Sequence, residues 1–241
     1  MKKLVLITGA AKGLGLAISK VLLEADYAVV GIGRNQTDEF NQLCEEYDNT
    51  CFFIPFDLAN TEEIKSLVRD ITKRHGHLYG LVNNAALGLD GVLATMHEKE
   101  IAKLIKVNVE APVLVAKYSS RSMLLSGKGR IINVGSIIGS TGFSGLSVYG
   151  ATKAAMEGFS RSLSREVGKA RITVNTLAPG YMSTNMTSGL EGDKLSSIVR
   201  RSPLGKLATV EDAAHMCKFL MSEEASAVTG AVFTVDAGST A

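Results

Sequence analysis

Tryptophan is absent from the 241 residues, and proline and cysteine are scarce, with four and three occurrences. Because Cys44, Cys51 and Cys217 are odd in number and form no Cys-x-x-Cys motif, the sequence predicts neither a disulfide framework nor a zinc site. This cysteine content is typical of proteins in a reducing compartment, and we therefore expect the protein in the cytoplasm. Charge of one sign is not in excess either, since 26 basic and 24 acidic residues give a formal charge of +2. We therefore expect neither nucleic acid nor a membrane surface as a partner.

Long apolar runs and histidine clusters are also missing. The apolar run over residues 4–7 is interrupted by Thr8 and Gly9, too early for a membrane span, and we interpret it as a first strand. The four histidines form no ligand pattern, so no metal site is predicted.

The chain does contain a regular alternation of short apolar runs and helical patterns, with 46% hydrophobic residues to fill a core. Strand-like runs cover residues 3–7, 28–32, 51–56, 78–82, 130–134, 171–177 and 231–235; helical patterns cover residues 14–25, 38–47, 61–74, 98–125, 149–167 and 210–221. Most runs are continuous in Val, Ile, Leu and Phe, as in parallel strands covered on both faces. The sequence therefore predicts an α/β fold, a Rossmann-type doubly wound three-layer sandwich with a seven-stranded parallel sheet.

No linker, repeat or low-complexity tract marks a domain boundary, so residues 1–241 are predicted to form a single domain. Residues 180–205 are the longest stretch of weak periodicity. Since a loop of this length in a compact domain is more often functional than structureless, we predict a substrate lid there.

A glycine cluster follows the first predicted strand and opens the first predicted helix. It comprises Gly9, Gly13 and Gly15, with Ala11, Lys12 and Leu14 between them. Glycine permits a tight turn and a close approach of backbone amides to a pyrophosphate, whose charge is favoured at the positive end of a helix. A purely structural turn is the alternative, but this is the position at which such sheets bind dinucleotides.

The residues at the end of the second predicted strand indicate whether NAD or NADP(H) is favoured. A carboxylate at this point would hold an unphosphorylated adenosine ribose, but the strand ends in Gly33-Arg34-Asn35. Arg34 and Lys12 are suited to a 2′-phosphate, which favours NADP(H) over NAD. Two solvated surface cations are the alternative interpretation.

Polar residues follow the third and fourth predicted strands, at the edge where ligands bind in this architecture. Asp57 and Leu58 end the third strand, and Asn83, Asn84 and Ala85 end the fourth. Asp57 is predicted to accept a hydrogen bond from the adenine amino group, and the two asparagines to fix adjoining strands or contact the adenosine ribose. Capping of turns is the alternative.

Tyr149 and Lys153 are four residues apart in the helix predicted over residues 149–167, so both project from one face. Ser136 ends the fifth predicted strand. A neutral tyrosine can donate its proton to a developing alkoxide, and we expect the Lys153 ammonium to lower the tyrosine pKa toward neutrality. Ser136 is placed to hydrogen-bond the substrate oxygen. With hydride from the cofactor, these three residues predict carbonyl reduction.

Asn108 lies in the helix predicted over residues 98–125, four residues before Pro112. Because proline has no amide hydrogen and crowds the carbonyl four residues earlier, Pro112 is predicted to free the Asn108 main-chain oxygen and kink the helix. The free carbonyl can hold a water that passes protons toward Lys153. A helix bent only to fit the sheet is the alternative.

The chain resembles the short-chain dehydrogenase/reductase family in Thr8-Gly9-x-x-x-Gly13-x-Gly15, Asn83-Asn84-Ala85, Asn108, Ser136, Tyr149-x-x-x-Lys153 and Pro179-Gly180. The resemblance spans nearly the whole chain. It implies a catalytic tetrad of Asn108, Ser136, Tyr149 and Lys153, with Lys153 also on the nicotinamide ribose. It also implies a tetramer, and nicotinamide contacts at Pro179, Gly180, Met182 and Thr184. Ala86 departs from the family, which has glycine there.

Within the family, residues 131–136, 158–163, 172–175 and 228–230 look like the 3-oxoacyl-(acyl-carrier-protein) reductases of fatty-acid synthesis. This likeness implies NADPH as the donor and a 3-oxoacyl thioester, carried on acyl carrier protein, as the substrate. Two alternatives stay open. One is a dehydrogenase of another alcohol, polyol or ketone, and the other is a non-enzymatic dinucleotide-sensing scaffold.

Apolar residues near the predicted site suit an acyl chain better than a sugar, although core packing is the alternative: Leu87, Leu89, Ile137, Ile138, Phe143, Leu146, Met182, Met186 and Leu190. Basic residues such as Lys128 and Arg130 precede strands, at the edge that should face away from the site. We interpret them as solvated surface charge at least as readily as a carrier contact, and predict no docking site.

Overall fold

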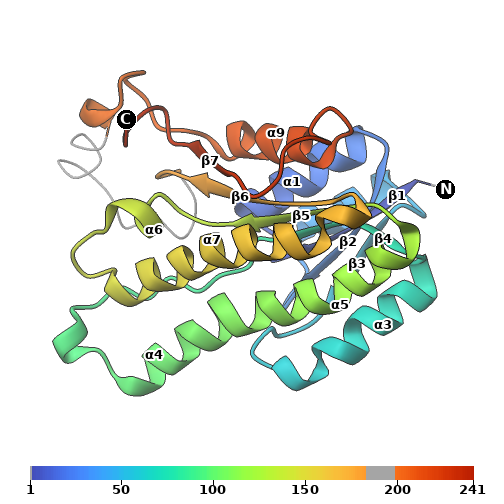
Figure 1. Cartoon of the computed structure of the whole chain (residues 1–241), viewed down its shortest axis with the longest axis horizontal. Helices are drawn as coiled ribbons and strands as arrows, with labels where there is room; N and C mark the ends of the chain where they lie inside the picture. Colours follow the sequence, from blue (N-terminus) through green and yellow to red (C-terminus); the bar gives the residue numbers. More distant parts are fainter. Residues whose placement is uncertain (1, 183–198) are drawn as a thin grey trace.

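Parallel strands form the centre of the molecule in the computed structural model, which describes residues 2–182 and 199–241 (Figure 1). Within those ranges one sheet of seven strands has the order β3-β2-β1-β4-β5-β6-β7, and every neighbouring pair is parallel. The strands are β1 (Lys3–Thr8), β2 (Tyr27–Gly33), β3 (Cys51–Pro55), β4 (Leu78–Asn83), β5 (Gly129–Val134), β6 (Ile172–Pro179) and β7 (Val232–Val235). The predicted doubly wound fold is confirmed.

Helices connect the strands and cover both faces of the sheet (Figure 1). The α-helices are α1 (Gly13–Glu24), α2 (Asp38–Glu46), α3 (Ile64–His75), α4 (Glu98–Ile105), α5 (Ala111–Ser126), α6 (Ile138–Thr141), α7 (Ser147–Val167) and α9 (Val210–Met221). Short 3₁₀ turns are η1 (Thr61–Glu63), η2 (Leu93–Thr95) and η4 (Gly168–Ala170). Each central strand therefore has helices above and below it, which explains the continuous apolar runs in the sequence.

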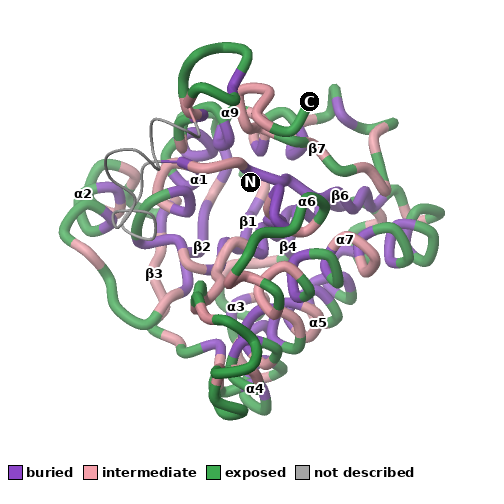
Figure 2. The backbone as a smooth tube through the Cα atoms, turned by 90° about the vertical axis from the view of Figure 1, so that its left-hand side faces the viewer, coloured by how far each residue is buried: buried purple, intermediate pink, exposed green. Residues whose placement is uncertain are grey.

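Two hydrophobic cores lie on the two sides of the sheet because successive side chains of a strand point to opposite faces. Val5 and Ile7 of β1 pack into the core under α1, α2 and α9. Leu4 and Leu6 of the same strand pack into the other core, under α3, α5 and α7. Figure 2 shows the strands buried between helices whose outer sides are exposed. Burial on both faces fixes the register of β1, since a slip by one residue would exchange the two sets.

The helix predicted over residues 98–125 is divided into three parts. A π turn, η3 (Lys106–Glu110), lies between α4 and α5, and the Ala111 amide donates to the Lys106 carbonyl five residues earlier. Pro112 removes the amide that an uninterrupted α-helix would direct at the Asn108 carbonyl. The prediction of one kinked α-helix was thus wrong, because a π turn divides the helix into two α-helices. Such π turns are often found at functional sites.

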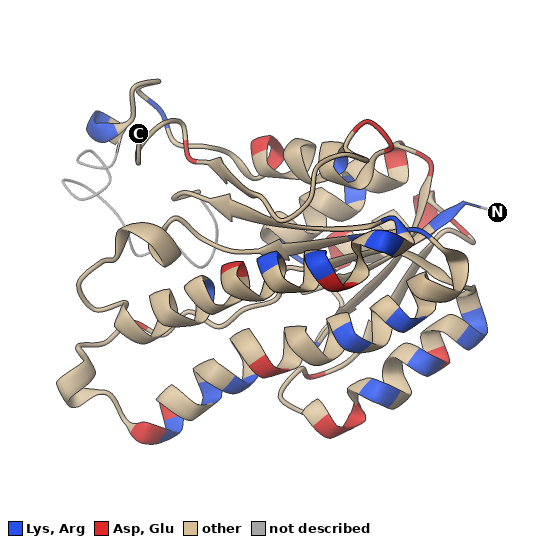
Figure 3. Cartoon of the chain, viewed as in Figure 1, with Lys and Arg blue, Asp and Glu red and all other residues tan. Residues whose placement is uncertain are grey.

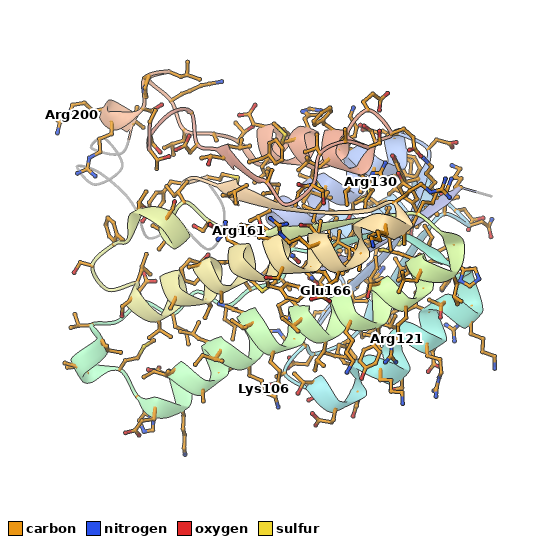
Figure 4. All side chains as sticks on the ribbon, in the orientation of Figure 1. Lys106, Arg121, Arg130, Arg161, Glu166 and Arg200 are labelled. Carbon is orange, nitrogen blue, oxygen red and sulfur yellow. The ribbon has the colours of Figure 1, made fainter. Side chains whose placement is uncertain are left out.

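Arg130 is buried at the amino end of β5, with 3% of its surface exposed. Its Nε donates to the Ser222 carbonyl at 3.1 Å, and its guanidinium lies 3.1 Å from the Glu223 carboxylate. Tyr27 and Tyr79 donate to the Met221 carbonyl at 3.2 and 3.0 Å. Figure 4 places Arg130 at the end of the sheet beside α9. The interpretation of Arg130 as solvated charge was wrong, because its side chain stabilises the C-terminus of α9.

The predicted lid over residues 180–205 lies largely outside the described residues, as do Thr184, Met186 and Leu190. Its last part is described: the Ser202 hydroxyl donates to the Ala237 carbonyl at 2.6 Å. No helix among residues 2–182 and 199–241 is long and apolar enough to cross a bilayer.

Candidate active site

The candidate site lies where the strand order reverses. The chain places β2 and β3 on one side of β1 and then returns to place β4 on the other side. Ligands bind outside the carboxyl ends of the strands at such a switch point. Thr8, the last residue of β1, joins β1 to the loop after β4. Its hydroxyl accepts hydrogen bonds from the Asn84 and Ala85 amides at 3.0 and 2.9 Å.

The glycine cluster forms a tight turn between β1 and α1. Gly9 and Gly13 have φ angles of +65° and +53°, which glycine adopts without strain. A Cβ on Gly15 would lie 2.1 Å from the Gly9 carbonyl oxygen, so no other residue fits that position. The Asn84 side chain fixes the turn by donating to the Thr8 and Gly9 carbonyls at 3.0 and 3.1 Å.

This turn fits a dinucleotide pyrophosphate. Helix α1 begins at Gly13, and Lys12 at its N-cap makes no side-chain hydrogen bond to the first turn. The first amides of α1 are therefore not capped by that side chain, and an anion is favoured at the positive end of the helix. Lys12 is exposed, while Ala11 and Leu14 are buried under the turn. The residues predicted from the glycine cluster thus lie together in the turn between β1 and α1.

At the carboxyl end of β2, Arg34 is exposed directly after the strand. The Thr37 hydroxyl, three residues later, donates to the Ala11 carbonyl at 2.7 Å and so joins the start of α2 to the glycine turn. Asp57 accepts a hydrogen bond from the Ala59 amide at 2.9 Å, the turn-capping role that was the alternative for this carboxylate. Leu58 is buried beside it.

Tyr149 and Lys153 come from successive turns of α7, and the Lys153 Nζ lies 5.6 Å from the centre of the Tyr149 ring. Lys153 is 4% exposed, and its Nζ donates to the carbonyl of Val134, the last residue of β5, at 2.9 Å. Ser136 follows two residues later and accepts a hydrogen bond from the Ile138 amide at 3.2 Å. The predicted trio is therefore brought together at the carboxyl end of β5.

The pKa of Tyr149 is raised to about 12, chiefly by burial. A hydrogen bond with Ser136 acts in the opposite direction, whereas the negative charge of Asp90 and the Tyr181 phenol raise the pKa further. Burial lowers the pKa of Lys153 to about 8. The prediction that Lys153 brings the tyrosine pKa toward neutrality was wrong for the chain alone, because removal from water outweighs other effects.

Asn108 is buried in the π turn and joins three parts of the site. Its side chain accepts from the Leu87 amide at 2.8 Å and donates to the Leu87 carbonyl at 2.9 Å. It also donates to the Thr152 hydroxyl at 3.3 Å, and that hydroxyl donates to the Tyr149 carbonyl at 2.7 Å. Asn108 thereby fixes the loop after β4 against the helix that carries Tyr149.

The segment after β6 passes the same edge of the sheet. The Pro179 carbonyl accepts from the Ile137 amide at 3.1 Å, and the Gly180 amide donates to the Val235 carbonyl at 2.9 Å. A Cβ on Gly180 would lie 2.6 Å from that of Asp236, so the close approach of β7 requires glycine. Met182 is buried at the end of this segment.

The sequence reasoning missed several residues of the site. Thr8 was part of the glycine motif but received no role, although its position at a strand end next to Gly9 was the signal. Thr152 lies between Tyr149 and Lys153 and its link to Asn108 has no sequence signal. Asp90 acts on Tyr149 from a loop whose Gly91 amide donates to the Gly145 carbonyl at 2.9 Å, a contact only the fold reveals.

Relatives of known sequence resemble the chain along its whole length. A family model described as enoyl-(acyl carrier protein) reductase matches residues 9–240. Carbonyl reductase family member 4 of Xenopus tropicalis is 36% identical over 238 residues, covering 99% of this chain and 98% of the relative. The 3-oxoacyl-(acyl-carrier-protein) reductase FabG of Vibrio cholerae is 34% identical over 238 residues, covering 98% of this chain and 96% of the relative.

Solved structures share the fold. A gluconate 5-dehydrogenase from Burkholderia cenocepacia, in complex with NADP and tartrate, has a TM-score of 0.94 at 27% identity and covers 100% of this chain and 96% of its own. A short-chain type dehydrogenase/reductase from Mycobacterium ulcerans has a TM-score of 0.92 at 28% identity, covering 98% of this chain and 89% of its own. With its tetrad and glycine turn at the switch point of a parallel sheet, the chain is an oxidoreductase that belongs to the short-chain dehydrogenase/reductase family.

Proposed function

We propose that the chain catalyses the NADPH-dependent reduction of a 3-oxoacyl thioester, carried on acyl carrier protein, to the 3-hydroxyacyl thioester. The observation that carries the proposal is the assembly of Tyr149, Lys153, Ser136 and Asn108 at the carboxyl edge of the sheet, beside a glycine turn that fits a pyrophosphate. The 34% identity to the Vibrio cholerae enzyme over 98% of this chain supports the choice of substrate.

The chain supplies a proton donor and a means of orienting the carbonyl. When bound, the reduced nicotinamide provides the hydride that the carbonyl carbon accepts. Tyr149 donates its proton to the carbonyl oxygen, and its pKa of about 12 keeps the phenol protonated at neutral pH. The Ser136 hydroxyl, two residues beyond β5, orients the same oxygen. Burial has lowered the pKa of Lys153 to about 8, so the amine exchanges protons readily near neutrality.

NADP(H) is proposed as the cofactor because the end of β2 offers cations and no carboxylate. Arg34 is exposed directly after β2, and Lys12 is exposed in the glycine turn that Thr37 joins to α2. An arginine side chain grips a phosphate with paired hydrogen bonds. The Arg34→Asp variant is expected to lose its preference for NADPH by at least about tenfold in kcat/KM relative to NADH. Unchanged selectivity would show that Arg34 does not contact the 2′-phosphate.

Apolar side chains around the site favour an acyl substrate. Ile137 and Ile138 are buried next to Ser136, and Leu87, held by Asn108, is half-buried. Phe143 is 55% exposed on the loop after α6. Figure 3 shows few charged residues around α6. Such a lining binds hydrocarbon better than a polyhydroxylated chain.

Reduction of another ketone or aldehyde is the second candidate, because the 36% identity to the Xenopus tropicalis carbonyl reductase is as high as that to the thioester reductase. Initial rates with NADPH on acetoacetyl thioesters, compared with a panel of ketones, polyols and quinones, separate the two. We expect the highest kcat/KM on the thioester. Negligible turnover of the thioester beside rapid turnover of a ketone would reject the first candidate.

The Tyr149→Phe variant tests the proton donor. It should lose reduction by about 10²–10⁴-fold, the usual contribution of general acid catalysis, while binding NADPH as tightly as the parent. Binding is followed by the change in NADPH fluorescence. Retained activity would contradict the role of Tyr149, and a matched loss of NADPH binding would show a misfolded site.

A homotetramer remains the family expectation, and one surface supports self-association. An apolar groove lies between α4 and α7, lined in part by Leu93, Ile105 and Val148. Leu93 and Ile105 are 55% and 49% exposed, which is high for aliphatic residues of a monomer. Light scattering after size exclusion tests the state, and Ile105→Glu should dissociate the assembly.

A further inference from the structure

Two of the three cysteines are in contact, although the sequence spacing gave no reason to pair them. Cys44 lies in the last turn of α2, and Cys51 is the first residue of β3. The Cys44 and Cys51 Sγ atoms lie 3.4 Å apart, within hydrogen-bond distance for sulfur. Both are free thiols. A disulfide requires the sulfurs to approach to about 2.05 Å, about 1.4 Å closer than they lie here.

The chain between the two cysteines holds them in this position. After α2 ends at Glu46, the Tyr47 carbonyl accepts hydrogen bonds from the Thr50 and Cys51 amides, both at 3.0 Å. Asn49 turns the backbone with a φ of +62°. Backbone hydrogen bonds therefore close this turn independently of the thiols. The two sulfurs are thus already close together in the reduced protein.

A small reagent can reach the pair from outside. The thiols lie in a surface depression of about 410 Å³ that Gln36, Phe52, Arg74 and His75 also line. Cys44 is half-buried and Cys51 is buried, so Cys44 is the sulfur that an incoming molecule meets first. Burial raises the pKa of both thiols, but the hydrogen bond between them lowers that of Cys44 and raises that of Cys51. Exposure and ionisation thus both favour Cys44 as the attacking sulfur.

We propose that Cys44 and Cys51 are a modification site at which a small-molecule disulfide introduces a reversible intramolecular disulfide. Cys44 loses its proton and attacks one sulfur of the reagent R–S–S–R, whose S–S bond breaks and releases one thiol R–SH. Cys51 then loses its proton and attacks the Cys44 Sγ of the mixed disulfide, releasing the second R–SH. The two cysteines are oxidised, the reagent is reduced to two thiols, and an excess of thiol reverses both steps.

The bond would join the end of α2 to the start of β3, across an eight-residue ring from Cys44 to Cys51. Figure 2 shows these two elements next to each other at one side of the molecule. The short ring restricts the unfolded chain, so the oxidised protein should melt about 5–10 °C higher than the reduced protein. Neither cysteine belongs to the tetrad or to the glycine turn, so the inference does not depend on the proposed substrate.

Oxidised glutathione, in excess at about pH 8.5 where thiolates are more abundant, tests the site on the whole chain. The remaining thiols are then alkylated in denaturant, and the protein is analysed by intact mass and by non-reducing peptide mapping. We expect the parent to lose two alkylatable thiols without gaining glutathione, and the peptides with Cys44 and Cys51 to be linked. Dithiothreitol should restore both thiols and the lower melting temperature.

Three variants separate the steps. Cys51→Ala should stop at the mixed disulfide and retain one glutathione on Cys44, whereas Cys44→Ala should resist oxidation. Cys217→Ala, which changes a buried cysteine of α9, should respond as the parent does. A parent that keeps glutathione on Cys44, keeps all its thiols, or melts at a lower temperature once the peptides are linked would overturn the proposal.

Discussion

The buried lysine that the proposed reaction requires is expected to destabilise the fold, and Lys153→Met tests this. Burial lowers the pKa of Lys153 from 10.5 to about 8. That difference corresponds to about 3 kcal/mol of unfolding free energy lost at pH 7, where the ammonium is charged in both states. Methionine has a similar length and no charge to desolvate, but it leaves the Val134 carbonyl without its 2.9 Å donor, at about 1–2 kcal/mol.

The net expectation is that Lys153→Met abolishes reduction and raises the free energy of unfolding at pH 7 by about 1–2 kcal/mol. The pH dependence has a definite sign. Because the folded pKa lies below the unfolded one, the penalty is complete below about pH 8 and disappears as the pH rises toward 10.5. The variant should therefore lose its advantage over that window.

Urea unfolding of both proteins at several pH values between 7 and 10.5 measures the difference directly. Taking the difference cancels the other groups that titrate there, and the exposed Lys169→Met serves as the control that should change little. If Lys153→Met is less stable than the parent at pH 7, or if its advantage does not vary with pH, the reasoning from burial is refuted.

Three further substitutions test the packing of the glycine turn, of α7 and of the amino end of β5. Gly15→Ala places a Cβ 2.1 Å from the Gly9 carbonyl oxygen and should destroy dinucleotide binding and lower the melting temperature, whereas Gly158→Ala, in open space on α7, should stabilise by about 0.5–1 kcal/mol. NADPH titration and thermal unfolding measure both, and equal effects would contradict the close packing of the turn. Arg130→Met leaves the half-buried Ser222 carbonyl without its donor and Glu223 with Lys3 as its remaining ion-pair partner, so urea unfolding should show a loss of about 1–3 kcal/mol. A loss below about 0.5 kcal/mol would show that Arg130 behaves as a surface charge.

The sequence could predict those parts of the molecule that depend on local spacing. The glycine turn, the pair Tyr149 and Lys153 on one helix face, and the continuous strands all follow from residues close together in the chain. Arg130 could not be placed in this way, since its partner Glu223 is 93 residues away. The contact between Cys44 and Cys51 likewise depends on how α2 and β3 end.

The pKa of Tyr149 shows a second limit of sequence reasoning. A lysine four residues away predicts a lowered pKa, yet burial raises it to about 12 with help from Asp90. The extent of burial follows from the packing of α7 against α6 and β6, and the charge of Asp90 comes from a loop distant in sequence. Neither is encoded in the spacing of the two residues.

Strand β5 carries the stabilising Arg130 near one end and leads into Ser136 of the candidate site at the other, and Figure 4 shows Arg130 far from α6. Four residues of extended chain separate Arg130 from Val134, a distance of about 13 Å. Changes to sites this far apart usually combine additively. Thermostabilising substitutions around α9 and substitutions in the candidate site around Ser136 can therefore be selected in separate libraries and merged in one protein.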